Sequence, residues 1–171
     1  YLTGLYNRRY LHETGANLYA NARRGNLHLT AGMLDLDHFK RINDTYGHQA
    51  GDLALQHVAC ILRQSVRSSD LVARYGGEEF CMLLVSGQAR EQADVFERVR
   101  SAVAAAPLDY DGQRIELTIS IGATAQLSGD FEAMLDSADQ LLYEAKTRGR
   151  DRVVMAPPPV SVVEHTAKPG S

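Results

Sequence analysis

Residues 71–85 read LVARYGGEEFCMLLV, and the rest of the sequence is best interpreted outward from this stretch. Two short apolar runs, 71–73 and 81–85, flank a Gly-Gly pair, which predicts two strands joined by a hairpin turn. Glycine tolerates the positive φ angles that tight hairpin turns require. Glu78 and Glu79 follow the turn directly, where their charges repel each other and a hard divalent cation would relieve the repulsion. The plainer alternative is a solvated turn that carries two acidic side chains.

Length and composition are those of one globular domain. The chain has 171 residues, of which 44% are hydrophobic and 23% charged, and this is enough for one domain with its own core. Its net charge of −3 argues against a general binder of nucleic acid or of anionic membranes. We therefore expect no nucleic-acid partner and no direct membrane contact, while a local basic pocket remains compatible with this charge.

Cysteine usage and hydropathy predict a cytoplasmic location. Cys60 and Cys81 lie in apolar runs without metal-ligand spacing, which predicts reduced core residues. No apolar stretch approaches the roughly 18 residues of a membrane span, and no signal peptide is visible. The chain lacks a starting Met, so we expect a fragment of a longer protein whose missing N-terminal segments carry a sensory or regulatory domain, or a membrane tether.

Hydrophobic periodicity predicts alternating helices and strands over most of the chain. The expected elements, in order, are helix 7–24, strand 27–37, a hydrogen-bonding loop over 38–52, helix 52–66, the hairpin strands, helix 89–105, strand 115–125, helix 131–147 and strand 152–155. This order predicts an α+β fold, a mixed central β-sheet covered by helices. Met134 and Tyr143 on the last helix are expected in the core. We assign residues 1–156 to one domain and expect the Pro-rich tail, 157–171, to be disordered.

A ferredoxin-like arrangement of this sheet would place the hairpin beside the first strand. Asp35, near the end of that strand, would then meet Glu78. Two carboxylates with a backbone carbonyl such as that of Leu36 form a hard-oxygen site typical of Mg²⁺ bound together with a phosphate ligand. Lys40 lies a few residues beyond Asp35 and would contact the same phosphates.

Four further polar residues have both a functional and a plainer interpretation. Lys146 and Arg150 would neutralise phosphates, but basic residues at a helix C-terminus also compensate the helix dipole. Asn43 and Asp52 would read a guanine edge through their amide and carboxylate groups. The alternatives are a turn residue for Asn43 and a helix N-cap for Asp52.

The sequence resembles the GGDEF family of diguanylate cyclases over nearly all of residues 2–155. Five motifs lie in the family's order: LTGLYNRR, DLDHFKRINDTYGHQAGD, RYGGEEF, TISIGAT and YEAKTRGR. The acidic pair is Glu-Glu rather than Asp-Glu, a variant that active members of the family also use. The resemblance implies the GGDEF fold, a ferredoxin-like architecture shared with the palm of nucleotide cyclases. It also implies synthesis of cyclic di-GMP from two GTP molecules, with Mg²⁺ or Mn²⁺.

The resemblance implies a role for each matching residue. Asp35, the Leu36 carbonyl and Glu78 would hold the metals, and Glu79 would act as a second ligand or help to deprotonate the attacking 3′-hydroxyl. Glu78, Glu79 and Lys40 are thus the expected catalytic residues. The expected GTP contacts are His38, Phe39, Lys40, Gly76, Gly77, Lys146 and Arg150 at the phosphates and Asn43 and Asp52 at guanine. Because one such domain holds one GTP, catalysis would require a homodimer of facing domains.

Arg67 and Asp70 lie in register with the family's RxxD inhibitory site, just before the hairpin. There they would bind the product, cyclic di-GMP, with Arg98 as a secondary contact. The alternative is a helix-end Arg and an Asp that leads into a strand. The chain begins inside the first family motif, so we expect a missing upstream signalling helix and an isolated fragment that is mostly monomeric and weakly active.

Two other functional classes remain open at the level of sequence. A degenerate GGDEF module would sense GTP or cyclic di-GMP without chemistry, but such modules usually lose the first Asp or the acidic pair, and both are present here. A nucleotide cyclase or polymerase palm acting on another substrate would share the two-carboxylate metal site. The guanine-reading pair and the Gly-Gly hairpin argue against that class.

Overall fold

The computed structural model describes residues 2–85 and 89–157. Its helices are α1 (Arg8–Arg23), α2 (Phe39–Tyr46), α3 (His48–Gln64), α4 (Ala89–Ala104) and α5 (Phe131–Thr147). Its strands are β1 (Thr30–Leu36), β2 (Leu71–Arg74), β3 (Glu79–Leu84), β4 (Leu108–Tyr110), β5 (Gln113–Ile115), β6 (Ile119–Thr124) and β7 (Val153–Met155). Apart from Pro157, the tail that we expect to be disordered lies outside the described residues.

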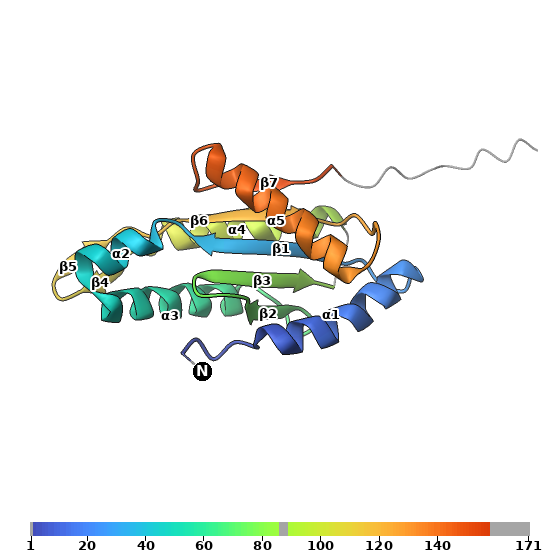
Figure 1. The fold of residues 1–171 in the computed structure, drawn as a ribbon, viewed down its shortest axis with the longest axis horizontal. Coiled ribbons are helices and arrows are strands. Elements are labelled where there is room, and N and C mark those ends of the chain that lie inside the picture. Colours follow the sequence, from blue (N-terminus) through green and yellow to red (C-terminus); the bar gives the residue numbers. More distant parts are fainter. Residues whose placement is uncertain (1, 86–88, 158–171) are drawn as a thin grey trace, which may run out of the picture.

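Five strands form the central sheet, in the order β2-β3-β1-β6-β7. β1 pairs antiparallel with both β3 and β6, whereas β6 and β7 are parallel, so the sheet is mixed. β4 and β5 form a separate two-stranded hairpin. Figure 1 shows the large sheet along the long axis of the molecule, with the tip of β1 and the β2–β3 turn at the same end. The predicted α+β fold, a mixed sheet covered by helices, is confirmed.

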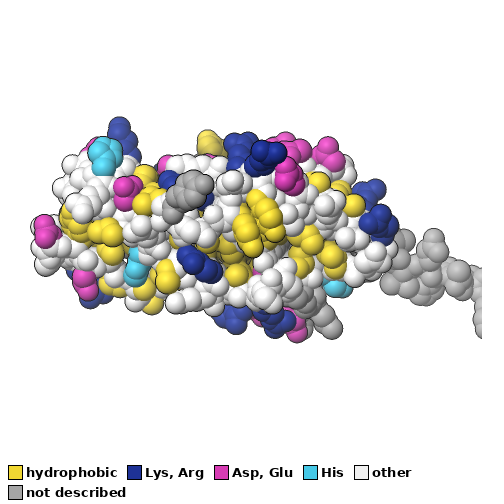
Figure 2. Space-filling view, turned by 90° about the horizontal axis from the view of Figure 1, so that it is seen from below, with side chains coloured by type: hydrophobic (Ala, Val, Ile, Leu, Met, Phe, Trp, Pro, Cys, Tyr) yellow, Lys and Arg dark blue, Asp and Glu magenta, His cyan; other side chains and the backbone are white. Residues whose placement is uncertain are grey.

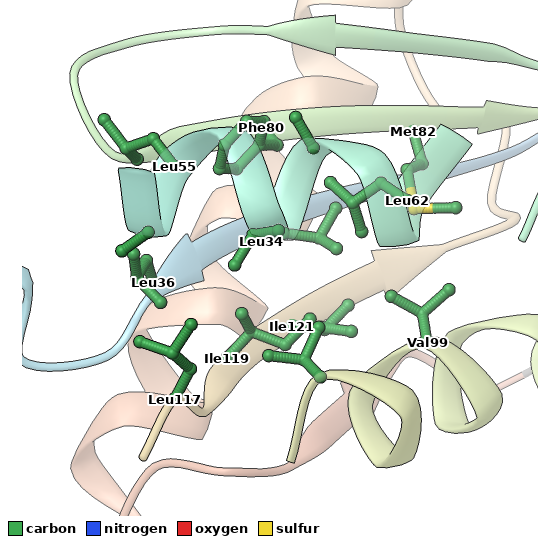
Figure 3. Packing of buried hydrophobic residues seen from close by; sticks show 14 of the residues in the cluster. Leu34, Leu36, Leu55, Leu62, Phe80, Met82, Val99, Leu117, Ile119 and Ile121 are labelled. Carbon is green, nitrogen blue, oxygen red and sulfur yellow. The ribbon is translucent and has the colours of Figure 1, made fainter. Parts of the chain in front are cut away.

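Both faces of the sheet are covered by helices, because its central strands are apolar on both sides. On one face, Leu34 and Leu36 of β1 join Phe80 and Met82 of β3 in a core closed by α3 and α4 (Figure 3). On the other face, Met33 of β1 belongs to a second core closed by α1 and α5. The sheet is therefore the middle layer of a three-layer molecule.

Helix α5 approaches β6 so closely that the strand has no room for a side chain at the contact. A Cβ on Gly122 would stand 2.0 Å from the Leu142 backbone nitrogen and 2.3 Å from the Ala138 carbonyl oxygen. Glycine is the residue that allows such an approach between two backbones. The close contact fixes α5 against the sheet, and the C-terminal turn of this helix comes beside the end of β1.

The predicted helices α1, α4 and α5 are confirmed to within a residue at each end, but other predicted bounds are wrong. The strand predicted over 27–37 begins only at Thr30, and the helix predicted over 52–66 begins at His48 and ends at Gln64. The loop predicted over 38–52 is occupied by α2 and the first turn of α3, and Gly47, with φ of 94°, separates the two helices. The single strand predicted over 115–125 is two strands, because β5 ends at Ile115 and β6 begins at Ile119. Alternating burial continues through the break, so periodicity alone does not reveal it.

Two side chains predicted in the core are exposed. Met134 is buried as expected, but Tyr143 is 70% exposed, because it follows the buried Leu142 and each helical residue turns by about 100°. Cys60 is exposed for the same reason, one position after a buried alanine, whereas Cys81 is fully buried in β3. Both cysteines are free thiols, as predicted.

The described helices include none that is both long enough and apolar enough to cross a membrane. Figure 2 shows one face of the molecule, where basic and acidic side chains lie among apolar ones.

Candidate active site

The candidate site forms where β1 ends beside the β2–β3 turn. Strand register places Asp35 opposite Glu79 of β3 on one side and opposite Ser120 of β6 on the other. The N–H of Leu36 donates to the carbonyl oxygen of Glu78 at 3.2 Å. Backbone pairing therefore brings Asp35 and the acidic pair together at one end of the sheet, as the sequence predicts.

Asp35 is a buried carboxylate with charged neighbours of both signs. The residue is 5% exposed, and its Oδ2 accepts a hydrogen bond from Lys146 Nζ at 2.7 Å. Burial raises the pKa of Asp35 from 3.8 to about 6, against the lowering effect of Lys146, and the charges of Glu78 and Glu79 add to the rise. Because burial outweighs the ion pair, a further positive charge beside Asp35 would stabilise its ionised form.

Glu79 has a second acidic neighbour on helix α5. Its pKa is raised, first by burial and then by the charge of Asp139, whereas Lys146 lowers it. A carboxylate with a raised pKa accepts a proton more readily than an exposed Glu does. The surroundings of Glu79 are thus compatible with both predicted roles, metal ligand and proton acceptor.

The turn of the hairpin differs from the sequence expectation. Neither Gly76 nor Gly77 has a φ in the left-handed region, so the prediction that this turn needs positive φ is wrong. Arg74 holds the turn, with Nη2 donating to the Gly77 carbonyl oxygen at 2.8 Å and Nε to that of Gly76 at 3.2 Å. A Cβ on Gly77 would meet nothing within 4 Å, so this glycine borders open space that a ligand can enter.

Helix α2 begins soon after β1 ends, with two residues between them. His38 precedes this helix in the left-handed conformation, with φ of 56° and ψ of 33°, and its side chain makes no capping hydrogen bond. The N–H of Ile42 donates to the His38 carbonyl oxygen at 3.1 Å, and the N–H groups before it have no partner within the helix. Such a turn, which contains Phe39 and Lys40, favours anions such as phosphate.

A cavity of about 510 Å³ joins the end of β1, the hairpin turn, α2 and the residues after α5. The residues of its lining that the sequence predicts are Asp35, Leu36, His38, Phe39, Lys40, Glu78, Lys146 and Arg150. The lining also contains Asp37, Arg41 and Asp44, which are not among the residues predicted from the sequence. Arg41 and Asp44 lie within one turn of Lys40 on α2, and this spacing was the signal available.

Asn43 and Asp52 lie outside that lining, at the contact between α2 and α3. Asn43 Oδ1 is buried and has no hydrogen-bond partner among the described residues. A Cβ on Gly51 would stand 1.8 Å from this oxygen, so glycine makes room for the amide next to the exposed Asp52. The exposed carboxylate of Asp52 can accept hydrogen bonds from a base edge that carries N–H donors.

The oxygen donors at the end of β1 fit a divalent cation that arrives with a ligand. Asp35 and Glu78 offer carboxylates, and Leu36, which lines the same cavity, offers a backbone carbonyl. Within residues 2–85 and 89–157, no group of three His, Cys, Asp or Glu side chains is placed to hold a metal by itself. Mg²⁺ typically takes one or two protein carboxylates and completes its shell with phosphate and water. The donor set therefore matches a nucleotide-bound cation.

A second cavity, of about 330 Å³, brings together the three residues predicted to form an inhibitory site. Arg67, Asp70 and Arg98 all line it, and both arginine residues are exposed. Asp70 Oδ2 accepts the N–H of Arg67 and Oδ1 accepts that of Val85, each at 3.0 Å. Asp70 thus ties the segment before β2 to the end of β3, and this tie orders the backbone around the cavity.

A family model described as diguanylate cyclase, GGDEF domain, matches residues 1–152. The chain belongs to this GGDEF family. The GGDEF domain is 44% identical over 156 residues to diguanylate cyclase DgcP of Pseudomonas aeruginosa, a match that covers 91% of this chain and 23% of that protein. It is 43% identical over 155 residues to diguanylate cyclase DosC of Escherichia coli K12, covering 89% of this chain and 34% of that protein.

Solved structures agree with this assignment. The GGDEF domain of DgcB from Caulobacter crescentus, in complex with c-di-GMP, matches with a TM-score of 0.86 and 32% identity, over 91% of this chain and 93% of that one. The predicted membership of the GGDEF family is confirmed. This GGDEF domain spans less than half the length of the curated relatives named above.

Proposed function

We propose that this GGDEF domain condenses two GTP molecules into cyclic di-GMP and two pyrophosphates. In each of two steps, the 3′-oxygen of one GTP bonds to the α-phosphorus of the other, pyrophosphate leaves with the electron pair of the broken bond, and the hydroxyl proton is released. The observation that carries this proposal is the convergence of Asp35, Glu78 and Lys146 with the first turn of α2 around one cavity. The names of the relatives support it.

The carboxylates at the end of β1 would hold the metal and prepare the nucleophile. Asp35, the Leu36 carbonyl and Glu78 would bind Mg²⁺ or Mn²⁺, which when bound offsets the negative charge of the triphosphate. Glu79 lies next in β3 and serves either as a further ligand or as the acceptor of the 3′-hydroxyl proton. Its pKa, raised first by burial, favours the second role, because a more basic carboxylate takes the proton more readily.

The triphosphate would lie between the first turn of α2 and the hairpin turn. Backbone N–H groups near His38 and Phe39 would donate to its oxygens, and the charge of Lys40 would stabilise the crowded negative charge of the transition state. Lys146 and Arg150 would add positive charge from the end of α5. Gly76 and Gly77 would let the phosphates approach the hairpin backbone, since neither has a side chain.

Guanine would be recognised beyond the phosphates, between α2 and α3. Asp52 accepts hydrogen bonds from paired N–H donors, as guanine offers on its Watson–Crick edge, and Asn43 both donates and accepts. Adenine does not present that donor pair, so these two residues would prefer GTP to ATP.

Two copies of the domain would complete the reaction. The residues described above accommodate one GTP, whereas the chemistry joins two, so we infer that two domains face each other with one GTP each. Placing the two reactants in line supplies much of the acceleration. The partners of this domain are then GTP, its product cyclic di-GMP, a second copy, and any regulatory segments of a longer protein.

The cavity lined by Arg67, Asp70 and Arg98 would bind the product and inhibit the enzyme. Guanidinium groups can pair with phosphate and guanine edges, and a carboxylate accepts from guanine N–H groups. Arg67→Ala should weaken cyclic di-GMP binding by about tenfold or more, because it removes a charge-assisted contact. Calorimetry with cyclic di-GMP checks this, with Arg114→Ala, a distant exposed arginine, as the control. Equal affinity of the parent and Arg67→Ala would refute the inhibitory site.

Incubation with GTP and Mg²⁺, followed by identification of every nucleotide formed, tests the proposed function. The expected products are cyclic di-GMP and pyrophosphate in a ratio of one to two, with no product from ATP. Binding of GTP without any product would instead favour a sensor module. A different nucleotide product would assign the same carboxylate site to another cyclase.

A further inference from the structure

We propose that Asp37 is a positioning residue, which holds the turn after α5 so that Arg150 faces the active-site cavity. The inference rests on the proposed function, because the group that Arg150 would meet there is the triphosphate of GTP. Asp37 lines the cavity, but it is not one of the predicted ligands, and its carboxylate is occupied by protein donors.

Three hydrogen bonds converge on the Asp37 carboxylate, which is 5% exposed as a residue. Oδ1 accepts from the Ser120 hydroxyl at 2.7 Å, and Oδ2 accepts from the Thr118 hydroxyl at 2.8 Å. The third donor is the backbone N–H of Asp151, which reaches Oδ2 at 3.1 Å. The first two bonds fix the carboxylate to β6 and the segment before it, so the third ties the turn after α5 to a rigid point.

The turn that Asp37 holds has an unfavourable backbone. Gly149, Arg150 and Asp151 follow one another with φ of 118°, 64° and 46°. Glycine adopts such angles readily, but residues with a Cβ resist them and keep them only where the surroundings fix the conformation. The Arg150 N–H donates to the Ala145 carbonyl oxygen at 3.0 Å, which caps α5 but leaves the next residue to be held from outside.

The turn is fixed from a second side by helix α4. Arg100 Nη1 donates to Asp151 Oδ1 at 2.8 Å, and the same guanidinium pairs with Glu97. Asp151 is therefore held through its N–H by Asp37 and through its carboxylate by Arg100. The backbone of Arg150, between the α5 cap and this doubly held residue, is therefore fixed on both sides, and its side chain lines the cavity.

Asp37 also belongs to the loop that carries the other phosphate contacts. It lies between Leu36 and His38, and its own N–H donates to the Thr118 carbonyl oxygen at 2.9 Å. One buried side chain thus connects the start of α2 with the end of α5, the two walls between which the triphosphate would lie. Loss of the carboxylate should loosen the contact to the triphosphate while leaving the guanine contacts of α2 and α3 in place.

Binding of two guanine nucleotides that cannot react tests this inference. Calorimetry with Mg²⁺ would compare 3′-deoxy-GTP, which lacks the attacking hydroxyl, with 3′-deoxy-GMP, which lacks the outer phosphates. Asp37→Ala should lower the affinity for 3′-deoxy-GTP by about tenfold, as loss of one charge-assisted contact predicts. The affinity for 3′-deoxy-GMP should stay nearly unchanged. Asp37→Asn keeps the volume and one acceptor oxygen, so its affinity should be intermediate, and it serves if Asp37→Ala does not fold.

Two further variants separate positioning from general stability. In an Arg150→Ala background, the Asp37 substitutions should have little further effect on the affinity for 3′-deoxy-GTP, because Arg150 is the group through which they act. Asp130→Ala removes another structural carboxylate of α5, one that accepts the Ala133 N–H at 2.9 Å at the opposite end of the helix. It should lower the melting temperature without changing the ratio of the two affinities.

The outcomes show whether the positioning role of Asp37 fails alone or together with the proposed function. If the parent binds neither nucleotide, both the proposed function and the role of Asp37 are wrong. If the parent binds both and the Asp37 variants bind them equally well, or lose both to the same degree, only the positioning role is refuted. An undiminished effect of Asp37 substitution in the Arg150→Ala background also refutes it.

Discussion

Asp35 is held in a state that weakens the fold and serves the site. Its carboxylate is buried beside two other acids, and the hydrogen bond from Lys146 does not offset the loss of hydration. A neutral residue at this position would be easier to bury. The charge is therefore better explained by what the domain binds than by what holds it together.

The pH dependence of stability should reveal the cost of burying the ionised Asp35 carboxylate. Without metal, the folded state binds the Asp35 proton more tightly than the unfolded state, with a pKa of about 6 against 3.8. The contribution of Asp35 to the free energy of unfolding is therefore greatest below pH 3.8, and it is lost as the pH rises to about 6. We expect Asp35→Asn to unfold near the parent's temperature at pH 4 and above it at pH 7 to 8. Thermal unfolding in chelator checks this, with exposed Glu116→Gln as control, and a pH-independent difference would contradict it.

Glu78 should matter for turnover and little for folding. Its side chain lines the cavity at the hairpin turn, so its removal opens space that water fills. Loss of a proposed metal ligand should reduce cyclic di-GMP formation by on the order of 100-fold or more. The measurement is the initial rate with GTP and Mg²⁺, beside a melting curve that shows an intact fold. A Glu78→Ala variant with the parent's rate would remove Glu78 from the metal site.

At the level of elements, the packing of α5 on β6 decides where Lys146 and Arg150 lie. Gly122→Ala would bring a methyl group within 2.0 Å of the α5 backbone. Because neither backbone can turn aside as a side chain does, we expect a loss of about 3 kcal/mol or more in the free energy of unfolding. Denaturant titration checks this. Gly77→Ala, where the new Cβ meets nothing within 4 Å, should change stability by about 0.5 kcal/mol or less, and equal losses would contradict the packing argument.

Much of the element order could be predicted from the sequence, and the errors have physical causes. The helices α1, α4 and α5 are long and strongly periodic, so their pattern alone locates them. The polar residues and glycines of 38–52 are typical of turns and therefore predict a loop, yet α2 buries only Ile42 and needs little apolar pattern. The break before Ile119 keeps the alternation of buried residues, so it leaves no trace in hydrophobicity.

Site residues that stand at the ends of predicted strands could be predicted from the sequence. Roles that depend on tertiary contacts could not. Carboxylates at the ends of predicted strands indicate Asp35 and Glu78 from the sequence alone. The restraint of Arg150 by Asp37 joins residues far apart in the chain, so spacing carries no sign of it. Hydrophobic pattern also fails for Tyr143, since an aromatic residue next to a buried leucine fits either face of a helix until the neighbouring layers are known.

At the scale of the whole molecule, the two cavities should work in a pair of domains rather than in one. If two facing copies form the active species, specific activity rises with protein concentration until pairing is complete. We expect the initial rate per mole of protein to increase across a hundredfold concentration series, with product removed enzymatically because it would occupy the second cavity. Sedimentation on the same samples gives the fraction of pairs. Constant specific activity with monomer throughout would refute the facing-pair mechanism.

The Lys146–Asp35 pair has a consequence for the order in which ligands arrive. Lys146 already places a positive charge on Asp35, so a divalent ion entering alone would have to displace an ammonium group that is hydrogen-bonded to this carboxylate at 2.7 Å. A metal that binds together with a nucleotide brings phosphate oxygens, which can accept hydrogen bonds from the displaced lysine. Lys146 then exchanges one anionic partner for another. We therefore expect weak affinity for the bare ion and strong mutual dependence between ion and nucleotide, a form of selectivity that requires no moving lid.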